Sequence, residues 1–439
     1  MTQITTVFSR LRKFIKNIGN NIVFIPAVGG FFGFLLAIIM YFLEDLGIST
    51  FLIDKLPFLV VNNYDTASTL LSTFSAGVLS ILVFSFSMVM LLLNQAGTNF
   101  SPRVLPGLIS VKSHQYIIGL FLGSILFNTI VLVGLRPTTD KYQLPGFSVL
   151  LGIFITTICL FAFIYFIDSI SRSIQVQNII SKIYRQVKTR MEHIKEAEDN
   201  YDEELIIDNN WHWVKSNKSG YLQDILASDL LRFATNHDIK ISIEKLEGSF
   251  LLEGQKLIQI SKKLNEEQTN ILLNFFIINR KGENILENYL YGFKQITEIG
   301  VRAMSPGVND PATAITTIDY LTELFALKMS MNEGFRYLKD VNNQVFVQLR
   351  SVTFNELLYQ IMVSYRTYCK NDMSCVQKLL LMLVQLKKLP HSNEKFDKII
   401  NKEIETLIYD VENNIQNPED LAQFKSLLKH SNTSIAISK

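Results

Sequence analysis

Four long apolar stretches separated by short polar connections occupy about the first 170 residues of the chain. They cover residues 22–46, 67–93, 116–135 and 147–167. At about 1.5 Å per helical residue, each stretch can cross roughly 30 Å of hydrocarbon, and each is longer than a typical strand. The pattern predicts a transmembrane domain of four helices over residues 22–173, with the lipid bilayer as its partner.

The pattern changes after the fourth stretch. Residues 174–200 are polar and helix-forming, and they predict a helical stalk that continues the fourth transmembrane helix. Residues 201–330 alternate short helical and strand-like patterns, which indicates an α+β module, and residues 331–439 have helical periodicity. The predicted fold class is an α-helical integral membrane protein with four transmembrane helices, followed by a cytoplasmic, mostly helical α+β domain.

Lysine and arginine predict the orientation of the chain. They gather before the first stretch and after the fourth stretch, and the second connection holds two more, Arg103 and Lys112. The first and third connections together hold only three, Lys55, Arg136 and Lys141. The positive-inside rule therefore places both termini in the cytoplasm. Residues 7–18 mix apolar and basic side chains at helical spacing, which predicts that residues 1–21 form a basic amphipathic segment on the anionic inner leaflet.

Composition narrows the functional classes. The net charge is +2 and the basic residues lie at the predicted membrane face, so no nucleic-acid partner is expected. The three cysteines and six histidines lack the spacing of metal ligands, and no phosphate-binding loop or nucleophile elbow occurs. The sequence therefore predicts no metal site, no cofactor and no catalytic residues, and we do not expect an enzyme.

Polar residues recur along the second apolar stretch. Because their interval is seven residues, they form one stripe along a helix, and they are Thr66, Thr73, Ser80, Ser87 and Asn94. An unpartnered hydroxyl costs free energy in hydrocarbon, so this polar stripe must face another helix or water. Tight helix packing is one interpretation. The other is a pore lining, with Phe84 and Phe86 available as hydrophobic constrictions.

Small residues indicate close helix contacts elsewhere. Gly29 and Gly33 in the first stretch, and Gly119 and Gly123 in the third, have the four-residue spacing that lets helix backbones approach. Together with the polar stripe, these faces exceed what one short bundle of four helices needs to bury. We therefore expect a homo-oligomer.

Residues 302–313, with the sequence RAMSPGVNDPAT, form the most distinctive segment of the predicted cytoplasmic part. Proline disfavours helical geometry in the residue before it, so one helix must end before Pro306. Asp310 then caps the next helix, with Pro311 at its first position. A structural turn explains these residues, whereas an anion or a neighbouring subunit could bind beside the exposed helix N-terminus. The candidates for such binding are Arg302, Ser305, Asn309 and Asp310.

Three motifs resemble a known family. They are Ser-Pro-Gly-Val-Asn-Asp-Pro at 305–311 followed by Ala-Thr-Ala, Phe-Ser-Pro-Arg at 100–103, and Ser-Gly-Tyr at 219–221. In this combination the chain resembles the bacterial predicted membrane protein family called domain of unknown function 2254, over about residues 20–330. The resemblance implies the same topology and a place in the bacterial inner (plasma) membrane. It implies no established activity.

Two functions of different classes remain open from the sequence. The first is an oligomeric channel or pore for a small ion, lined by the second transmembrane helix and regulated by the cytoplasmic domain. The alternative is a membrane-anchored sensor or scaffold that binds an unknown cytoplasmic ligand or protein without transport. A continuous wet path past Thr73, Ser80 and Ser87 in an assembly would favour the first.

Overall fold

A computed structural model describes most of the chain. The described residues are 23–49, 61, 63–99, 112–135, 145–173, 175–197, 205, 207, 208, 210–280, 288–390 and 393–430. The chain divides into two compact units, which we call the apolar bundle (Met1–Thr98 and Val104–Gln175) and the mixed domain (Asn99–Arg103 and Val176–Lys439). The predicted amphipathic segment at 1–21 and the motif at 100–103 lie outside the described residues.

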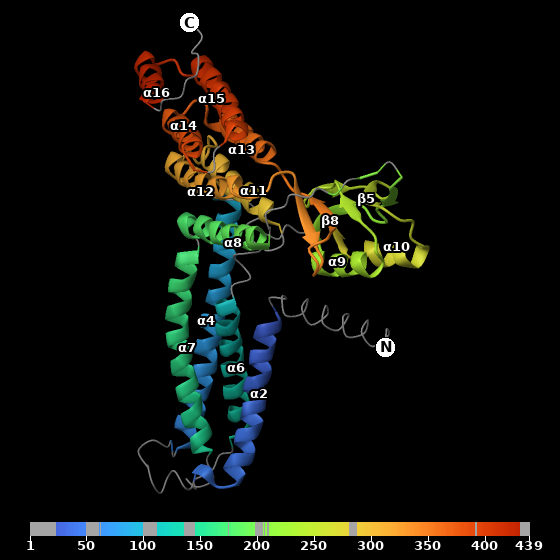
Figure 1. Cartoon of the computed structure of the whole chain (residues 1–439). Coiled ribbons are helices and arrows are strands. Elements are labelled where there is room, and N and C mark those ends of the chain that lie inside the picture. The colour runs from blue at the N-terminus through green and yellow to red at the C-terminus, as the bar shows by residue number, and fades with distance from the viewer. Residues whose placement is uncertain are drawn as a thin grey trace. The chain divides into compact units, whose positions relative to one another are not determined.

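The apolar bundle contains four helices that are long and apolar enough to cross a membrane. They are α2 (Phe24–Asp45), α4 (Tyr64–Asn99), α6 (Lys112–Gly134) and α7 (Gly146–Ser173) (Figure 1). Each overlaps one predicted apolar stretch, so the number and place of these helices are confirmed. With 36 residues, α4 is the longest of the four. At about 1.5 Å per residue it is much longer than roughly 30 Å of hydrocarbon requires.

Glycines bring α2 and α6 into backbone contact. A Cβ atom added to Gly29 would lie 2.6 Å from the backbone of Gly119, and one added to Gly33 would lie 2.1 Å from the carbonyl oxygen of Gly123. The small residues singled out in the first and third stretches therefore pack against each other within one chain. This leaves the polar stripe as the face that argues for an oligomer.

A carboxylate fixes the first residues of α7. Glu44, near the end of α2, accepts hydrogen bonds from the backbone nitrogen and the hydroxyl of Ser148, both at 2.8 Å. Ser49 Oγ accepts a third, from the backbone nitrogen of Phe147 at 2.9 Å. The free N–H groups at a helix N-terminus favour an anionic acceptor, so this contact ties α2 to α7.

The mixed domain begins with two small sheets. Their strands are β1 (His212–Lys215), β2 (Gly220–Ile225), β3 (Ile241–Ile243), β4 (Phe250–Leu251), β5 (Lys256–Ile260), β6 (Phe276–Asn279), β7 (Phe335–Lys339) and β8 (Val345–Arg350). One sheet has the order β1-β5-β3-β8-β7 and the other β4-β2-β6. Only the β3–β8 pairing is parallel among these described strands.

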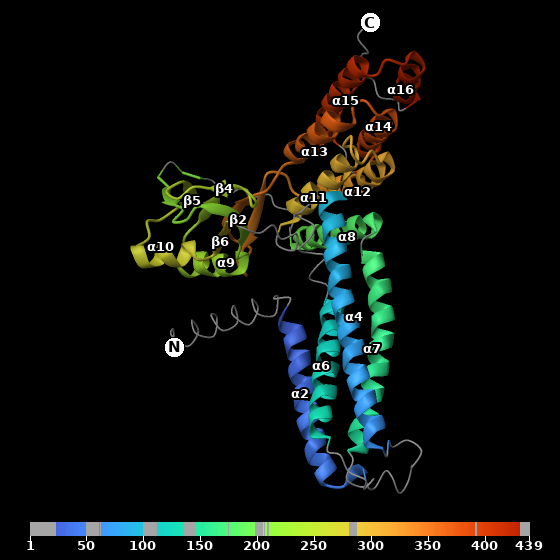
Figure 2. The ribbon, with the colours of Figure 1, turned by 180° about the vertical axis from the view of Figure 1, so that it is seen from behind.

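A shared core joins both sheets to a helix. Helix α9 (Ala227–Asn236) lies beside the strands (Figure 2). Its residues Leu230 and Phe233 are buried together with Leu222, Ile258 and Val347 of the strands. The short helix α10 (Glu266–Leu273) precedes β6 and begins with a capping box at Asn265.

The strands β7 and β8 correct the sequence analysis, which expected helical structure over residues 331–439. Aromatic and β-branched residues are frequent in 335–350, and such residues favour strands. This segment forms strands because β8 pairs with β3, which is distant in the sequence. The periodicity of a short segment contains no information about such a distant partner. The α+β module therefore takes two strands from beyond residue 330.

The rest of the mixed domain is helical. Its helices are α8 (Val176–Ala197), α11 (Tyr289–Ala303), α12 (Pro311–Met329), α13 (Phe354–Cys369), α14 (Met373–Lys387), α15 (Glu394–Asn414) and α16 (Pro418–His430) (Figure 1). The expected stalk is a packed helix instead. Because Ile180, Val187 and Met191 recur on one face, α8 buries them against α11 and α12. It is also not continuous with α7, since Gln175 is not helical.

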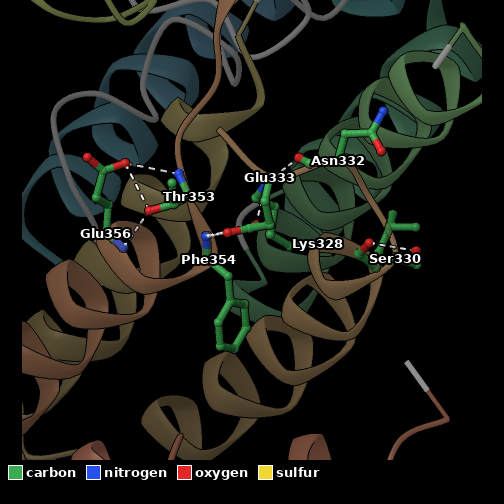
Figure 3. A network of polar contacts seen from close by, with 8 residues as sticks. Lys328, Ser330, Asn332, Glu333, Thr353, Phe354 and Glu356 are labelled. Atoms are coloured by element: carbon green, nitrogen blue, oxygen red, sulfur yellow. Dashed lines mark hydrogen bonds and ion pairs between the residues drawn. The ribbon is translucent and has the colours of Figure 1, made fainter. Parts of the chain in front are cut away.

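A buried cation lies between α12 and α13. The Lys328 side chain is fully buried, with its Nζ atom 3.4 Å from Glu333 Oε1 and donating to the carbonyl of Asn332 at 3.3 Å (Figure 3). The Glu333 carboxylate also accepts from the backbone nitrogen of Phe354, at 3.0 and 3.1 Å. This ion pair therefore links the last turn of α12 to the first residue of α13.

Candidate functional site

The polar stripe of α4 faces outward from the apolar bundle. Leu71, Val78 and Ser85 are at most 1% exposed and face the bundle interior. Thr73, Ser80 and Ser87 each follow two residues later, which is a rotation of about 200° around a helix of 3.6 residues per turn. All five residues of the stripe are exposed, including Thr66 and Asn94 at its two ends. The predicted polar face therefore exists, and no helix of its own bundle covers it.

Hydroxyls of this face bond to their own helix. Ser80 Oγ donates to the carbonyl of Ala76 at 2.9 Å, and Ser87 Oγ donates to the carbonyl of Val83 at 3.0 Å. This back-bonding is what the packing interpretation expects, because it satisfies the donor. Each serine oxygen keeps lone pairs that can accept from water or from a neighbouring helix. The space beside Gly77, one turn before Ser80, is also open, since no atom lies within 4 Å of a Cβ built there.

The two aromatic residues differ in their contacts. Phe84 packs edge-to-face on Phe163 of α7, with 5.9 Å between the ring centroids, and it remains 52% exposed. Phe86 is 50% exposed. Both rings are therefore accessible beside the polar stripe, and the position of Phe84 is partly fixed by α7.

A second set of polar residues, missed by the sequence analysis, lies inside the bundle. Asn128 of α6 is fully buried and donates from Nδ2 to Thr156 Oγ1 of α7 at 3.3 Å. Nearer the other end, His114 Nε2 and Ser169 Oγ are 3.0 Å apart. For Asn128 and Thr156 the available signal was a polar residue inside an apolar stretch, because such residues usually face the bundle interior. Each pair joins α6 to α7.

Residues 304–310 form the turn between α11 and α12, and Arg302 lies in the last turn of α11. Asp310 caps α12 by accepting from the backbone nitrogen of Thr313 at 3.1 Å and from its hydroxyl at 2.6 Å. The Ser305 carbonyl accepts from the backbone nitrogen of Asn309 at 3.0 Å, and Asn309 has a left-handed φ of 47°. These contacts fit the structural interpretation of the turn. Binding of an anion or a subunit at Arg302, Ser305 and Asn309 stays a prediction.

A small polar cavity in the mixed domain was not predicted. Its volume is about 40 Å³, enough for about one water molecule, and its polar lining comprises Glu247, Asn288, Arg336, Arg350 and Ser351. Burial raises the pKa of Glu247 to about 7, although the nearby Arg336 acts in the opposite direction. Asn288 caps α11 through its side-chain oxygen, at 2.9 Å from the backbone nitrogen of Leu290. No sequence pattern indicates this cavity, because its polar residues come from four separate segments of the chain.

Comparison with known proteins places the chain among uncharacterised membrane proteins. Residues 19–385 match the family described as "Predicted membrane protein (DUF2254)", which confirms the resemblance noted in the sequence. Similar curated proteins are the Uncharacterized proteins MT1328 and Rv1290c of Mycobacterium tuberculosis and Mb1321c of Mycobacterium bovis. Each is 21% identical over 347 residues, which is 76% of this chain and 65% of the relative. The chain thus spans less than two thirds of the length of these relatives. No solved structure matches it.

Proposed function

We propose that this protein, which belongs to the domain of unknown function 2254 family of predicted membrane proteins, forms an oligomeric channel or pore in a bacterial inner membrane. Its four apolar helices cross the bilayer with both termini in the cytoplasm, and α4 lines the conducting path. The mixed domain lies in the cytoplasm and regulates the path.

The observation that carries this proposal is the outward polar face of α4. Thr73, Ser80 and Ser87 are exposed on the bundle surface, so in a single subunit they would face lipid. Lipid offers no hydrogen-bond partner for their remaining lone pairs. If α4 helices of several subunits gather around one axis, the same face instead meets water. A water-filled path satisfies all of these positions at once.

A membrane-anchored binding module is the second candidate. The back-bonded serines fit a dry helix–helix contact as well as a pore, and the cavity beside Glu247 offers a polar site in the mixed domain. In this alternative the α4 face serves to assemble subunits, and a cytoplasmic ligand or protein is recognised without transport.

Substitution of Ser80 separates the two candidates. Reconstituted wild-type protein should conduct in planar bilayers, and Ser80→Leu should lower the current while light scattering in detergent shows an unchanged oligomer. In a dry contact, Ser80→Leu would overfill the interface at a cost of about 1–3 kcal/mol and weaken assembly. Leu79→Phe is the matched control, because Leu79 is exposed on α4 but outside the stripe. An absence of current from wild type across varied salts, with loss of assembly in Ser80→Leu, would favour the binding module.

The orientation needs its own test. Thr138→Cys and Ser431→Cys are introduced separately into a protein whose three native cysteines are replaced. A membrane-impermeant maleimide added to cells with a permeabilised outer membrane should label Thr138→Cys and leave Ser431→Cys unlabelled. The opposite labelling pattern would reverse the proposed topology.

A further inference from the structure

The small polar cavity beside Glu247 has room for one occupant. Its lining comes from Ile194 of α8, Ile225 of β2, Glu247, Arg336 of β7 and residues 288–290 at the start of α11. Its volume of about 40 Å³ suits one water molecule or one monatomic ion. Separate segments of the mixed domain therefore surround a space for a single small species.

Two buried donors belong to residues that line this cavity. Asn288 is 1% exposed, and its side-chain oxygen accepts from the backbone nitrogen of Leu290 at 2.9 Å. Asn288 Nδ2 and Arg336 Nε are both buried and have no hydrogen-bond partner among the described residues. A Cβ added to Gly248 would lie 3.2 Å from Asn288 Nδ2, so this nitrogen points towards the segment that carries Glu247. A buried donor without an acceptor is unfavourable, and the cavity therefore suits an acceptor.

The charges around the cavity favour a negative occupant. Charged side chains of three elements act on the Glu247 carboxyl group, and they are Arg336 of β7, Asp224 of β2 and Arg190 of α8. Arg350 also lines the cavity and donates to Glu356 at 2.8 Å. When Glu247 is ionised, three carboxylates balance the three arginines. When Glu247 is protonated, one positive charge remains, and the N-terminus of the 15-residue helix α11 adds to it.

We propose that this cavity binds one chloride ion, with Asn288 Nδ2 and Arg336 Nε as its hydrogen-bond donors. Chloride is close to a water molecule in size and can only accept hydrogen bonds. Phosphate and organic carboxylates are larger than the cavity, and the two N–H donors and the arginines oppose a cation. The ion would contact residues of α11 and β7 at once, and it would therefore stabilise the packing between them.

Chloride and a proton should bind together. A second anion beside a carboxylate favours the protonated carboxyl group, so chloride binding adds one proton to Glu247. One chloride and one proton enter, the charge of the site is unchanged, and no atom changes oxidation state. Burial raises the pKa of Glu247 to about 7, although Arg336 acts in the opposite direction, so this uptake falls near neutral pH. This inference does not depend on the proposed pore.

The test is a chloride titration of the full-length protein in detergent, with gluconate replacing chloride at constant ionic strength. Wild type should show a saturable rise in melting temperature with chloride, because a ligand that binds only the folded state stabilises it. It should also broaden the NMR signal of chloride. The apparent affinity at pH 8 should be about tenfold lower than at pH 6, since the protonated fraction of a group with a pKa of about 7 falls by that factor.

Asn288→Asp removes the donor and keeps the oxygen that caps α11. It should lower the chloride affinity by more than about tenfold, because an anionic oxygen replaces a donated hydrogen bond. Asn265→Asp is the matched control. Asn265 caps α10 in the same way, at 2.8 Å from the Gln268 nitrogen, and does not line the cavity, so this variant should respond to chloride as wild type does.

Glu247→Gln tests the linked proton. Glutamine stays neutral at all of these pH values, so the chloride affinity of this variant should be the same at pH 6 and pH 8. A variant that kept the tenfold pH dependence of wild type would exclude Glu247 as the group that takes up the proton.

Three results would overturn the site itself. They are equal melting temperatures of wild type in chloride and gluconate, no broadening of the chloride signal by wild type, and an unchanged chloride response in Asn288→Asp. The first two would show that the cavity holds only water. Circular dichroism and gel filtration check the fold of each variant. If Asn288→Asp does not fold, Arg336→Lys decides, because it keeps the charge, removes the Nε donor and should weaken chloride binding by about tenfold.

Discussion

Single residues set how closely the apolar helices approach. At Gly33 the space that a Cβ would fill is occupied by the backbone of Gly123, which cannot move without moving α6. A glycine in a helix interior lowers helix stability by about 1 kcal/mol relative to alanine. The close packing of α2 on α6 therefore offsets the low helix propensity of glycine at this position.

Gly33→Ala should destabilise the apolar bundle by about 1–3 kcal/mol, because the new methyl group overfills the contact with α6. Thermal unfolding in detergent, followed by circular dichroism, measures the change. Gly134→Ala is the control, since no atom lies within 4 Å of a Cβ at that position. An equal or higher melting temperature for Gly33→Ala would contradict the contact.

The half-buried Glu247 predicts a pH dependence of stability. Burial raises its pKa from 4.5 to about 7 in the folded protein. Between these two values the folded state holds more protons than the unfolded state, so stability should fall as pH rises through that window. Above about pH 7 the stabilisation that protonated Glu247 provides at lower pH is fully lost.

Glu247→Gln should flatten this part of the curve, because glutamine stays neutral. Melting temperatures of wild type and variant between pH 5 and pH 8 provide the measurement. Glu253→Gln, at an exposed glutamate, should leave the wild-type slope unchanged. Identical slopes for wild type and Glu247→Gln would refute the assignment.

Residue patterns in sequence revealed local features and missed distant ones. The seven-residue interval of the polar stripe and the glycine pairs were visible because helical geometry alone relates their members. The partner of the Gly29–Gly33 face was not visible, since helix order in a bundle is a tertiary property. The cavity at Glu247 was missed for the same reason, as its residues come from separate segments.

Between elements, the Lys328–Glu333 pair joins α12 to α13. Glu333→Gln should destabilise the mixed domain by about 3–5 kcal/mol, because it leaves the fully buried Lys328 without its carboxylate. Adding Lys328→Met should restore most of the loss, since the unpaired charge is then gone. Urea unfolding of wild type, Glu333→Gln, Lys328→Met and the double variant forms the cycle. Glu412→Gln is the control, because its partly exposed pair with Lys425 should contribute less than about 1 kcal/mol.

Element types were predictable where the pattern was long. Four apolar helices of more than twenty residues were found, and the Asp310 cap and Pro311 located the start of α12. The strands β7 and β8 have five and six residues, and in so short a window strand and helix patterns overlap. The many polar residues of α8 led to the prediction of a stalk, although its buried isoleucines pack on α11 and α12.

At the scale of the whole molecule, each unit has apolar clusters of its own among the described residues. The clusters around Phe127 and Phe121 consist of residues of the apolar bundle, and the cluster around Leu222 consists of residues of the mixed domain. A core that closes within one unit does not require the other for its burial. The chain should therefore unfold in two transitions.

Residues 176–439 produced alone should be folded, with a melting temperature within a few degrees of the corresponding transition in the full chain. Circular dichroism and calorimetry of both proteins give the comparison. Aggregation of residues 176–439, or a melting temperature far below that of the full chain, would show that the bundle supplies part of the stability.

The parallel pairing of β3 with β8 also has a consequence for synthesis. Gln348 of β8 donates to Ser242 of β3 at 2.8 Å across 106 residues of sequence. At roughly 5–20 residues per second, a ribosome needs about 5–20 s to make that interval. Until then one edge of β3 has no partner strand, and an open edge can pair with another nascent chain. The fold therefore leaves this edge of β3 open to misassembly during translation, before α13 has been made.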